Sequence, residues 1–355
     1  RKALDMVGGR AYLAMLTADV PSTANAGEYA KIVAEKAVVR KLIEAAEDIE
    51  AKGYEEKTDA KELLDEAEGD IFRIAQRRQK KDYVKIQDVL LKNVKLIDEA
   101  VKNKGSVTGL PTGFKKLDEV TSGLQPSDLI IIAARPAMGK TAFALNIAQQ
   151  SAVKAGASVL IFSLEMSQEQ LGQRLISMEA RVEADKIKKG NLDINDWKNI
   201  NYALNELNKT KIVIDDTPGI SVMEMRNKCR RLKAEQGLDL IVVDYLQLMT
   251  FGGRAESRQQ EIAALSRNLK LLAREMNCPV IVLSQLSRKP EERQDKRPLL
   301  SDLRESGSIE QDADIVIFLY RDDYYNDNSE KPGVCEVNIA KHRSGELAKI
   351  DLTWV

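Results

Sequence analysis

The stretch LIIIAARPAMGKTAFALNIAQQ, residues 129–150, contains three patterns in succession. It opens with a short apolar run, Leu129–Ala134, of the kind found in strands that are buried on both faces. Its centre, ARPAMGKT at 134–141, has the pattern of a phosphate-binding loop whose first glycine is replaced by alanine. The residues after the loop are mostly helix formers. A strand, such a loop and a helix in this order predict the first unit of an α/β nucleotide-binding domain.

The loop indicates which groups would bind a nucleoside triphosphate. Backbone N–H groups of such a loop surround the phosphates at the N-terminus of the following helix. We expect Lys140 to reach the β- and γ-phosphates, and Thr141 to bind Mg²⁺. Gly139 lets the backbone approach the phosphates, and Ala134 fits the first position as long as its φ stays negative. A chance match is the alternative, which the flanking strand and helix disfavour. The residues expected at the nucleotide are Ala134, Arg135, Pro136, Ala137, Met138, Gly139, Lys140, Thr141, Ala142 and Asp244.

From about Gly109 onwards, short β-branched runs alternate with helical segments. The runs do not alternate in polarity, as expected for parallel strands covered on both faces. The sequence therefore predicts a mostly parallel, twisted sheet with helices on both faces. Two further strand-like runs on either side of Ser344-Gly345 predict a C-terminal hairpin at a sheet edge. The other strands are expected at 129–134, 159–162, 212–214, 240–243, 280–283 and 315–319.

Three polar residues follow these expected strands directly. Asp244 ends the run LDLIVVD and is expected to hold Mg²⁺ together with Thr141, although it could instead be a loop or helix-capping aspartate. Glu165, in FSLEMS, is expected to orient and polarise the attacking water, with a capping or surface glutamate as the alternative. Gln285 could hydrogen-bond the γ-phosphate or the water, or it could be an ordinary polar strand end.

The first hundred or so residues favour helices. Apolar residues recur at helical spacings from Glu28 to about residue 54 and again in TDAKELLDEAEGDIFRIAQRR, which predicts an antiparallel helical hairpin. A third amphipathic helix, in KIQDVLLKNVKLIDEAVKN, could pack on the next domain or on a neighbouring subunit. We therefore expect a partial helical domain at 1–80, a linker with an amphipathic helix at 81–108 and an α/β domain at 109–355.

The composition narrows the classes of function. Lys and Arg (54) nearly balance Asp and Glu (55), so any contact with nucleic acid must come from local patches. The three cysteines are far apart, which argues against a disulfide framework or a zinc site and favours the reducing cytoplasm. The single histidine, His342, excludes sites that need several. The absence of an apolar run of roughly 18–20 residues argues against a membrane-spanning helix.

Five motifs, in this order, resemble those of the bacterial hexameric replicative DNA helicases, the DnaB family. They are GLPTGFKKLDEVTSGLQPSDLIIIAARPAMGKTAF, FSLEMS, IVVDYLQLM, LSQLSR and DLRESGSIEQDADIVIFLYRD. The resemblance covers nearly the whole chain and implies a RecA-like ATPase domain at 109–355. It also implies a homohexameric ring that uses ATP and Mg²⁺ to move along single-stranded DNA and to unwind the duplex at the replication fork, in the cytoplasm. A primase and a helicase loader are the implied partners.

The same resemblance assigns further details. The segment at about 82–103 is similar to the linker helix that docks on the adjacent subunit, and the first half of the N-terminal domain would precede residue 1. Alanine at the first loop position, Ala134, is a variant that the family tolerates. Ala137 departs from the family, which more often has serine there, and we expect no change in function.

Two segments are candidates for contact with DNA. One begins with Gly252-Gly253 and follows the strand that ends at Asp244; the other, SDLRESGSIEQ, follows the strand that ends at Gln285. The resemblance places Arg304, Glu305 and Gly307 of the second segment at the DNA backbone, where phosphates are held without reading bases. From composition alone, both would be ordinary solvated loops.

The segment IAKHRSGE contains two cations on an expected edge strand. Alternate side chains of a strand share a face, so Lys341 and Arg343 should point one way and His342 the other. They come late in the chain, away from their own phosphate loop, and the simplest geometry sends them to the site of the next subunit. The matching lysine and arginine of the family act in this way, and such an arginine stabilises charge in the transition state. A solvated basic strand is the alternative.

Two other functions share the same nucleotide-binding core. A recombinase-like filament protein is disfavoured by the N-terminal hairpin and linker helix. A scaffold that binds nucleotide but hardly turns it over is disfavoured by Glu165 together with a basic residue acting in trans.

Overall fold

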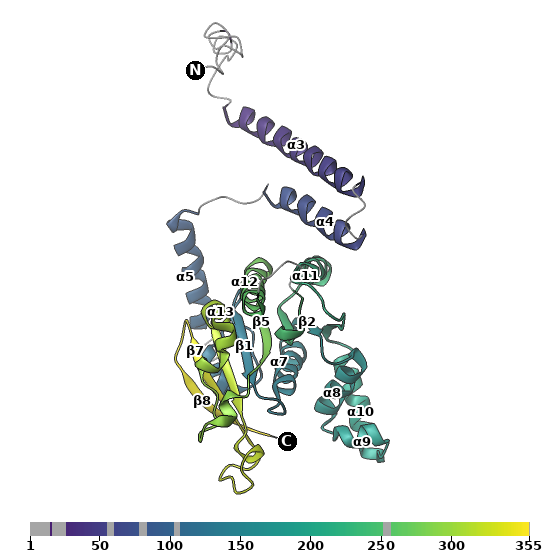
Figure 1. Cartoon of the computed structure of the whole chain (residues 1–355), viewed down its shortest axis with the longest axis vertical. Coiled ribbons are helices and arrows are strands. Elements are labelled where there is room, and N and C mark those ends of the chain that lie inside the picture. The colour runs from purple at the N-terminus through teal and green to yellow at the C-terminus, as the bar shows by residue number, and fades with distance from the viewer. Residues whose placement is uncertain are drawn as a thin grey trace. The chain divides into compact units, whose positions relative to one another are not determined.

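A computed structural model describes Met15 and residues 26–54, 60–77, 84–102, 107–250 and 257–354. The chain divides into two compact units, Arg1–Val94 and Lys95–Val355 (Figure 1). Among the described residues, no helix has both the length and the apolar character needed to cross a bilayer.

The first unit contains the two long helices that the spacing predicts, α3 (Ala26–Tyr54) and α4 (Ala60–Arg77). They lie side by side (Figure 1) and are joined by an ion pair in which Lys52 Nζ is 2.9 Å from Glu66 Oε2. A third helix, α5 (Ile86–Lys102), follows. The apolar side chains of α5 whose exposure is described are all exposed in the single chain: Ile86, Val89, Leu90, Leu91, Val94, Ile97 and Val101.

An eight-stranded sheet forms the centre of the second unit, with the order β3-β2-β4-β5-β1-β6-β7-β8. The first six strands in this order are parallel and the last two pairings are antiparallel. All six parallel strands and the C-terminal hairpin at the sheet edge are therefore confirmed. The strands are β1 (Leu129–Ala134), β2 (Ser158–Ser163), β3 (Lys211–Asp215), β4 (Leu240–Asp244), β5 (Val280–Gln285), β6 (Ile315–Tyr320), β7 (Val334–His342) and β8 (Ala348–Thr353).

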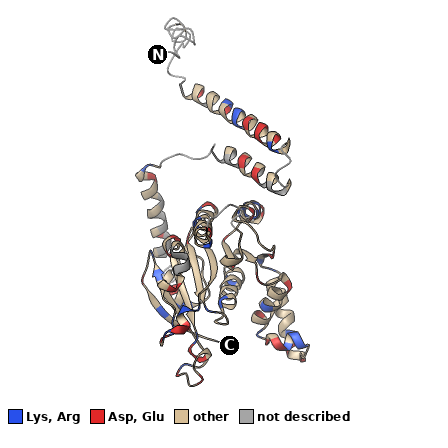
Figure 2. Cartoon of the chain, viewed as in Figure 1, with Lys and Arg blue, Asp and Glu red and all other residues tan. Residues whose placement is uncertain are grey.

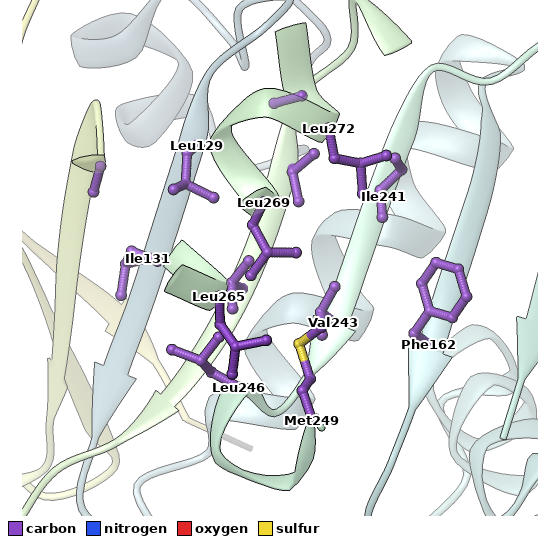
Figure 3. Close-up of a cluster of buried hydrophobic side chains, with 14 of the residues drawn as sticks. Leu129, Ile131, Phe162, Ile241, Val243, Leu246, Met249, Leu265, Leu269 and Leu272 are labelled. Atoms are coloured by element: carbon purple, nitrogen blue, oxygen red, sulfur yellow. The ribbon is translucent and has the colours of Figure 1, made fainter. Parts of the chain in front are cut away.

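Helices cover both faces of this sheet. Leu129 and Ile131 of β1 belong to one apolar cluster, which includes α12, whereas Ile130 and Ile132 belong to the cluster that includes α7. Figure 3 shows the first cluster, where side chains of α12 lie against β1 and β4. Because alternate residues of one strand enter different clusters, the doubly covered sheet is confirmed. The helices are α6 (Lys115–Thr121), α7 (Lys140–Ala155), α8 (Gln168–Ala180), α9 (Ala184–Lys189), α10 (Ile194–Leu207), α11 (Val222–Gln236), α12 (Arg258–Met276) and α13 (Gly307–Asp312).

Charge is spread over the second unit without a single dominant sign. Figure 2 shows Lys and Arg interspersed with Asp and Glu in this view, with Lys186, Lys188 and Lys189 gathered on the short helix α9. Two of these three lysines pair with carboxylates, Lys189 with Asp185 and Lys186 with Asp196. This agrees with the near balance of charges in the sequence.

The strand register defines two opposite edges of the sheet. At the carboxyl edge, Ala134 pairs with Gln285 and Ser163 with Asp244, so the ends of four parallel strands lie together. At the other edge, the first residue of β6, Ile315, pairs with Ile130 on one side and with His342 on the other. The carboxyl edge is where sheets of this type bind ligands.

Candidate active site

The phosphate loop connects β1 to α7 as the sequence predicts. Ala134 is the last residue of β1 in regular strand conformation, so a methyl group fits at this position. Gly139 is the N-cap of α7 and has a φ of 85°, which favours glycine. Ala137 has a φ of 64°, a left-handed conformation that is also unusual for the serine of related loops. Replacing serine by alanine therefore leaves the backbone requirement unchanged.

Thr141 and Asp244 lie in direct contact at the end of this loop. The Thr141 hydroxyl donates to Asp244 Oδ2 at 2.7 Å. Asp244 is only 4% exposed, and its other oxygen, Oδ1, is buried without a hydrogen-bond partner. Burial raises the pKa of Asp244, and the hydrogen bond from Thr141 opposes this effect. A buried carboxylate oxygen without a partner beside a hydroxyl suits Mg²⁺ or its bound water.

The donor set is small, which fits Mg²⁺ bound together with phosphate. Within residues 26–54, 60–77, 84–102, 107–250 and 257–354, no group of three or more His, Cys, Asp and Glu residues could hold a metal. Mg²⁺ commonly takes one or two protein ligands and completes its shell with phosphate oxygens and water. Thr141 and Asp244 are therefore the residues that would hold it.

Lys140 and Glu165 lie at the same edge as Asp244. The Lys140 ammonium is 3.4 Å from the carbonyl oxygen of Ala134, and burial lowers the pKa of Lys140 while Asp244 and Glu165 act in the opposite direction. The turn that carries Glu165 is fixed because the N–H of Leu164 donates to Asp244 O at 2.7 Å. Glu165 itself is exposed.

The helix after Glu165 has its own cap. Ser167 is the N-cap of α8 and forms a capping box with Gln170. Glu165 is therefore not a member of the capping box, which removes one alternative for it. Its carboxylate is exposed at the edge where Lys140 and Asp244 meet.

Gln285 ends β5, and Gln247 holds it in place. Gln247 lies in the 3₁₀ turn η2 (Leu246–Leu248), and its side-chain amide donates to Gln285 O at 3.0 Å and Ser284 Oγ at 3.1 Å. Its carbonyl oxygen accepts from the N–H of Gln285 at 3.3 Å. The sequence reasoning missed Gln247, whose signal is a lone polar residue in the apolar run YLQLM three positions after Asp244.

Two side chains close the loop in ways that the sequence did not indicate. Arg135 forms a two-point ion pair with Glu291, so its guanidinium is engaged within the chain. The Trp354 ring packs on Gly139 so closely that a Cβ at Gly139 would overlap it. The Arg321 guanidinium lies 4.2 Å from the Trp354 ring centroid. Trp354 follows the edge strand β8 as an isolated aromatic residue, and no motif pointed to it.

Lys341 and Arg343 lie at the opposite edge of the sheet from the phosphate loop. Arg343 N donates to Asp314 O at 2.9 Å, and Asp314 N donates to Leu129 O, which places Arg343 across β6 from the first residue of β1. Five residue steps of about 3.3 Å, or roughly 17 Å of strand, separate that residue from Ala134. Arg343 therefore lies far from its own loop, as the sequence suggested.

Both cations contact the C-terminal end of α13 in the single chain. Lys341 Nζ donates to the carbonyl oxygens of Glu310 at 2.5 Å and Ala313 at 2.7 Å. Arg343 donates to Gln311 O, and its guanidinium is 3.5 Å from Asp314 Oδ1. His342 instead contacts Glu346 O at 3.3 Å. The two cations thus share one side, as the alternation of the strand predicts.

The candidate DNA segments are described in part. Gly252 and Gly253 lie outside the described residues, and so do the side chains of Arg304 and Glu305. The backbone of the second segment is helical, with η4 (Leu300–Ser306) followed directly by α13 at Gly307. The expected loop is thus wrong for this segment, because Asp302 accepts from the N–H of Leu299 and begins a 3₁₀ turn.

Comparisons with known proteins agree on one family. The model of the DnaB-like helicase C terminal domain matches residues 109–355, and that of the DnaB-like helicase N terminal domain matches residues 1–35. The Replicative DNA helicase DnaC of Bacillus subtilis (strain 168) is 51% identical over 353 residues, which cover 99% of this chain and 78% of that protein. The Replicative DNA helicase DnaB of Geobacillus stearothermophilus has the same identity and coverage.

Two solved structures share the fold. One, a DnaB-like replicative helicase described with its interactions with primase, has a TM-score of 0.82 and 39% identity, and covers 99% of this chain and 82% of its own. The other, an isolated ATPase domain, has a TM-score of 0.73 and 42% identity, and covers 77% of this chain and 96% of its own.

The buried carboxylate gives a first testable prediction. Replacing Asp244→Asn should keep or raise the thermal midpoint of the ligand-free protein at pH 7, because the raised pKa of Asp244 means that its charge is costly in the folded state. This cost is present above the folded pKa and disappears as the pH falls towards the unfolded value of about 4. The advantage of the variant should therefore shrink between pH 7 and pH 4, as followed by circular dichroism.

The same variant should respond less to ligand. Mg²⁺ with a nucleoside triphosphate should raise the midpoint of the unmodified protein more than that of Asp244→Asn, because the asparagine lacks the charge that attracts the cation. A midpoint at pH 7 several degrees below that of the unmodified protein would contradict the first expectation.

Proposed function

Because the chain belongs to the family of DnaB-like replicative helicases, it is a nucleotide-driven DNA helicase, and we propose that it hydrolyses ATP with Mg²⁺ at the phosphate loop to move along single-stranded DNA. The observation that carries this proposal is the contact of Thr141 with the buried Asp244, whose second oxygen has no partner. When bound, Mg²⁺ would bridge phosphate oxygens and neutralise their charge.

The residues at the carboxyl edge have distinct roles in this proposal. Backbone N–H groups of the loop bind the phosphates, and Lys140 stabilises the negative charge that moves to the leaving oxygen. Glu165 holds the attacking water and accepts its proton as the new bond to the γ-phosphorus forms and the bond to ADP breaks. The position of Gln285, next to Ala134 in register, suits a group that senses the γ-phosphate.

The placement of Arg343 and Lys341 supports a ring. A chain whose cations lie at the sheet edge opposite its own loop cannot complete its own site without a large rearrangement. We infer that they leave the carbonyl groups of α13 and reach the loop of the adjacent subunit. The exposed apolar face of α5 supports docking of this helix on a neighbour, in a homohexamer.

The remaining partners follow from the family. Arg304, Glu305 and Gly307 are proposed to hold single-stranded DNA by its phosphates, at the junction of η4 and α13. The solved relative that is described with primase supports a primase partner, and a helicase loader is proposed from the family alone. We place the protein in the cytoplasm, where its DNA substrate and ATP are found.

Glu165→Gln should separate binding from turnover. Nucleotide should still bind, because the phosphate loop is unchanged, but hydrolysis should fall by about 10²–10⁴-fold through loss of the proton acceptor. Turnover is measured by phosphate release and binding by a fluorescent ATP analogue. Glu169→Gln, an exposed neighbour in the first turn of α8, serves as the matched control and should hydrolyse ATP normally. Near-normal turnover by Glu165→Gln would remove it from this role.

A mixing experiment tests the role of Arg343 in trans. Arg343→Ala protein has an intact loop, and Lys140→Ala protein has an intact Arg343, so each alone should be inactive. Mixed rings should regain hydrolysis only where an intact loop meets an intact Arg343, and an arginine finger typically contributes roughly 10³–10⁵ in rate. Normal hydrolysis by Arg343→Ala alone, or no recovery in rings shown to be mixed, would refute the assignment.

Arg304→Ala should weaken binding of single-stranded DNA by a similar factor for all sequences. Its loss removes one phosphate contact, so the slope of log affinity against log salt should decrease by roughly one unit or slightly less. Fluorescence anisotropy across a range of salt concentrations measures this. Arg231→Ala, an exposed arginine on α11, is the control. A loss that depends on base sequence would point to a different mode of binding.

A further inference from the structure

Ion pairs fasten the segment between β5 and η4 at both ends. We call residues 286–302 the strap; they include the 3₁₀ turn η3 (Lys289–Glu292). Two buried prolines, Pro290 and Pro298, restrict the backbone within it. The strap leads from the strand end at Gln285 to the segment that carries Arg304.

The first attachment of the strap is to the phosphate loop. Arg135 Nε is 2.9 Å from Glu291 Oε1, and Arg135 Nη2 is 3.2 Å from Glu291 Oε2. A third donor, Arg135 Nη1, contacts Leu286 O at 2.8 Å. Arg135 is the residue directly after Ala134, and its side chain is 13% exposed. Such a planar, two-point pair fixes orientation as well as distance, so the strap cannot shift without moving this part of the loop.

The second attachment closes the strap on the start of η4. Arg293 Nη1 and Nη2 contact the two carboxylate oxygens of Asp302 at 2.9 and 2.7 Å. The Asp302 side chain is 3% exposed and also accepts from the N–H of Leu299. Only one residue separates Glu291 from Arg293, and one residue separates Asp302 from Arg304. The two pairs therefore form a short, continuous connection from the phosphate loop to the candidate DNA segment.

A third pair fastens the strap to the C-terminal hairpin. Arg297 Nε and Nη2 contact the two oxygens of Glu336, on β7, at 2.7 and 2.8 Å. The Arg297 guanidinium also lies 4.8 Å from the centroid of the Tyr320 ring, at the end of β6. The strap thus has a fixed base on the sheet, against which its two ends are held.

We propose that Glu291 is a positioning residue that couples occupancy of the nucleotide site to the grip on DNA. A change in the loop at Arg135 on nucleotide binding is passed through Glu291 and Arg293 to Asp302, and so to the backbone at Arg304. The proposal rests on the proposed function, since it assumes that ATP binds at the loop and that DNA binds at Arg304. Glu291 touches neither ligand and acts through Arg135.

A merely structural role for Glu291 makes a different prediction. The Glu291 side chain is 34% exposed, and surface ion pairs of this kind contribute little to stability. Loss of the pair should therefore leave the fold and each separate site intact. What should change is the effect of one ligand on the affinity for the other, which is a coupling between sites.

The experiment compares Glu291→Gln with Glu292→Gln in the whole chain of 355 residues. Both variants lose one negative charge from the same turn, and Glu292 is exposed. The dissociation constant for a fluorescein-labelled oligo(dT) is measured by anisotropy with and without ATPγS and Mg²⁺. The ratio of the two constants is the coupling factor, and by thermodynamic linkage DNA must change the affinity for ATPγS by the same factor.

We expect the coupling factor of Glu291→Gln to fall to within about twofold of one, when typical coupling spans roughly 5–150-fold. Its affinity for ATPγS without DNA, its rate of hydrolysis without DNA and its thermal midpoint should match those of Glu292→Gln, which should keep the full coupling. Arg293→Gln, which breaks the second pair, should lose coupling in the same way.

Each other outcome has a separate meaning. An unmodified protein that binds ATPγS or oligo(dT) poorly, or shows no coupling, would contradict the proposed function and with it the basis of the inference. A coupled unmodified protein with equal coupling in Glu291→Gln and Glu292→Gln would overturn the role of Glu291 alone. A lower thermal midpoint with uniform weakening of all activities in Glu291→Gln would show a structural role and would also overturn it.

Discussion

The pairing of β1 with β5 on one side and β6 on the other determines the arrangement of the functional residues. Because β1 is central and parallel to both neighbours, its residues must be apolar on both faces, and its carboxyl end must open onto the same edge as theirs. The phosphate loop can only begin there. Asp244, Glu165 and Gln285 reach the loop because the strands that carry them, or that precede them, end at this edge.

The antiparallel pairing of β7 with β6 reverses this geometry for the last cations. A strand that enters antiparallel at the edge of a parallel sheet ends where its neighbours begin, so Lys341 and Arg343 lie beside the start of β6. The strap crosses between the two regions, since Arg135 at the carboxyl edge and Glu336 on β7 both hold it. One sheet thus connects three places that the proposed reaction needs.

The sequence predicted what depends on local pattern and spacing. Continuous β-branched runs identified all six parallel strands, and the loop motif placed Lys140 and Thr141 at the start of a helix. The alternation of a strand placed Lys341 and Arg343 on one side. The family resemblance supplied the roles proposed for them, which no spacing could have indicated.

What the sequence did not predict depends on contacts between distant residues. Arg135 and Glu291 are separated by 156 positions, and the packing of Trp354 on Gly139 joins the last strand to the loop. Gln247 gave a weak signal because its function lies in holding the backbone of another strand. The helical form of the segment at Arg304 depends on Asp302 and its buried partner Arg293.

The opposite placement of the loop and of Arg343 has a consequence for the nucleotide pool of the cell. If Arg343 completes only the site of a neighbour, a newly made chain can bind ATP but cannot consume it while it remains alone. Idle subunits awaiting assembly would then hold nucleotide without futile hydrolysis. The direction of one edge strand would in this way restrict fuel consumption to the assembled machine.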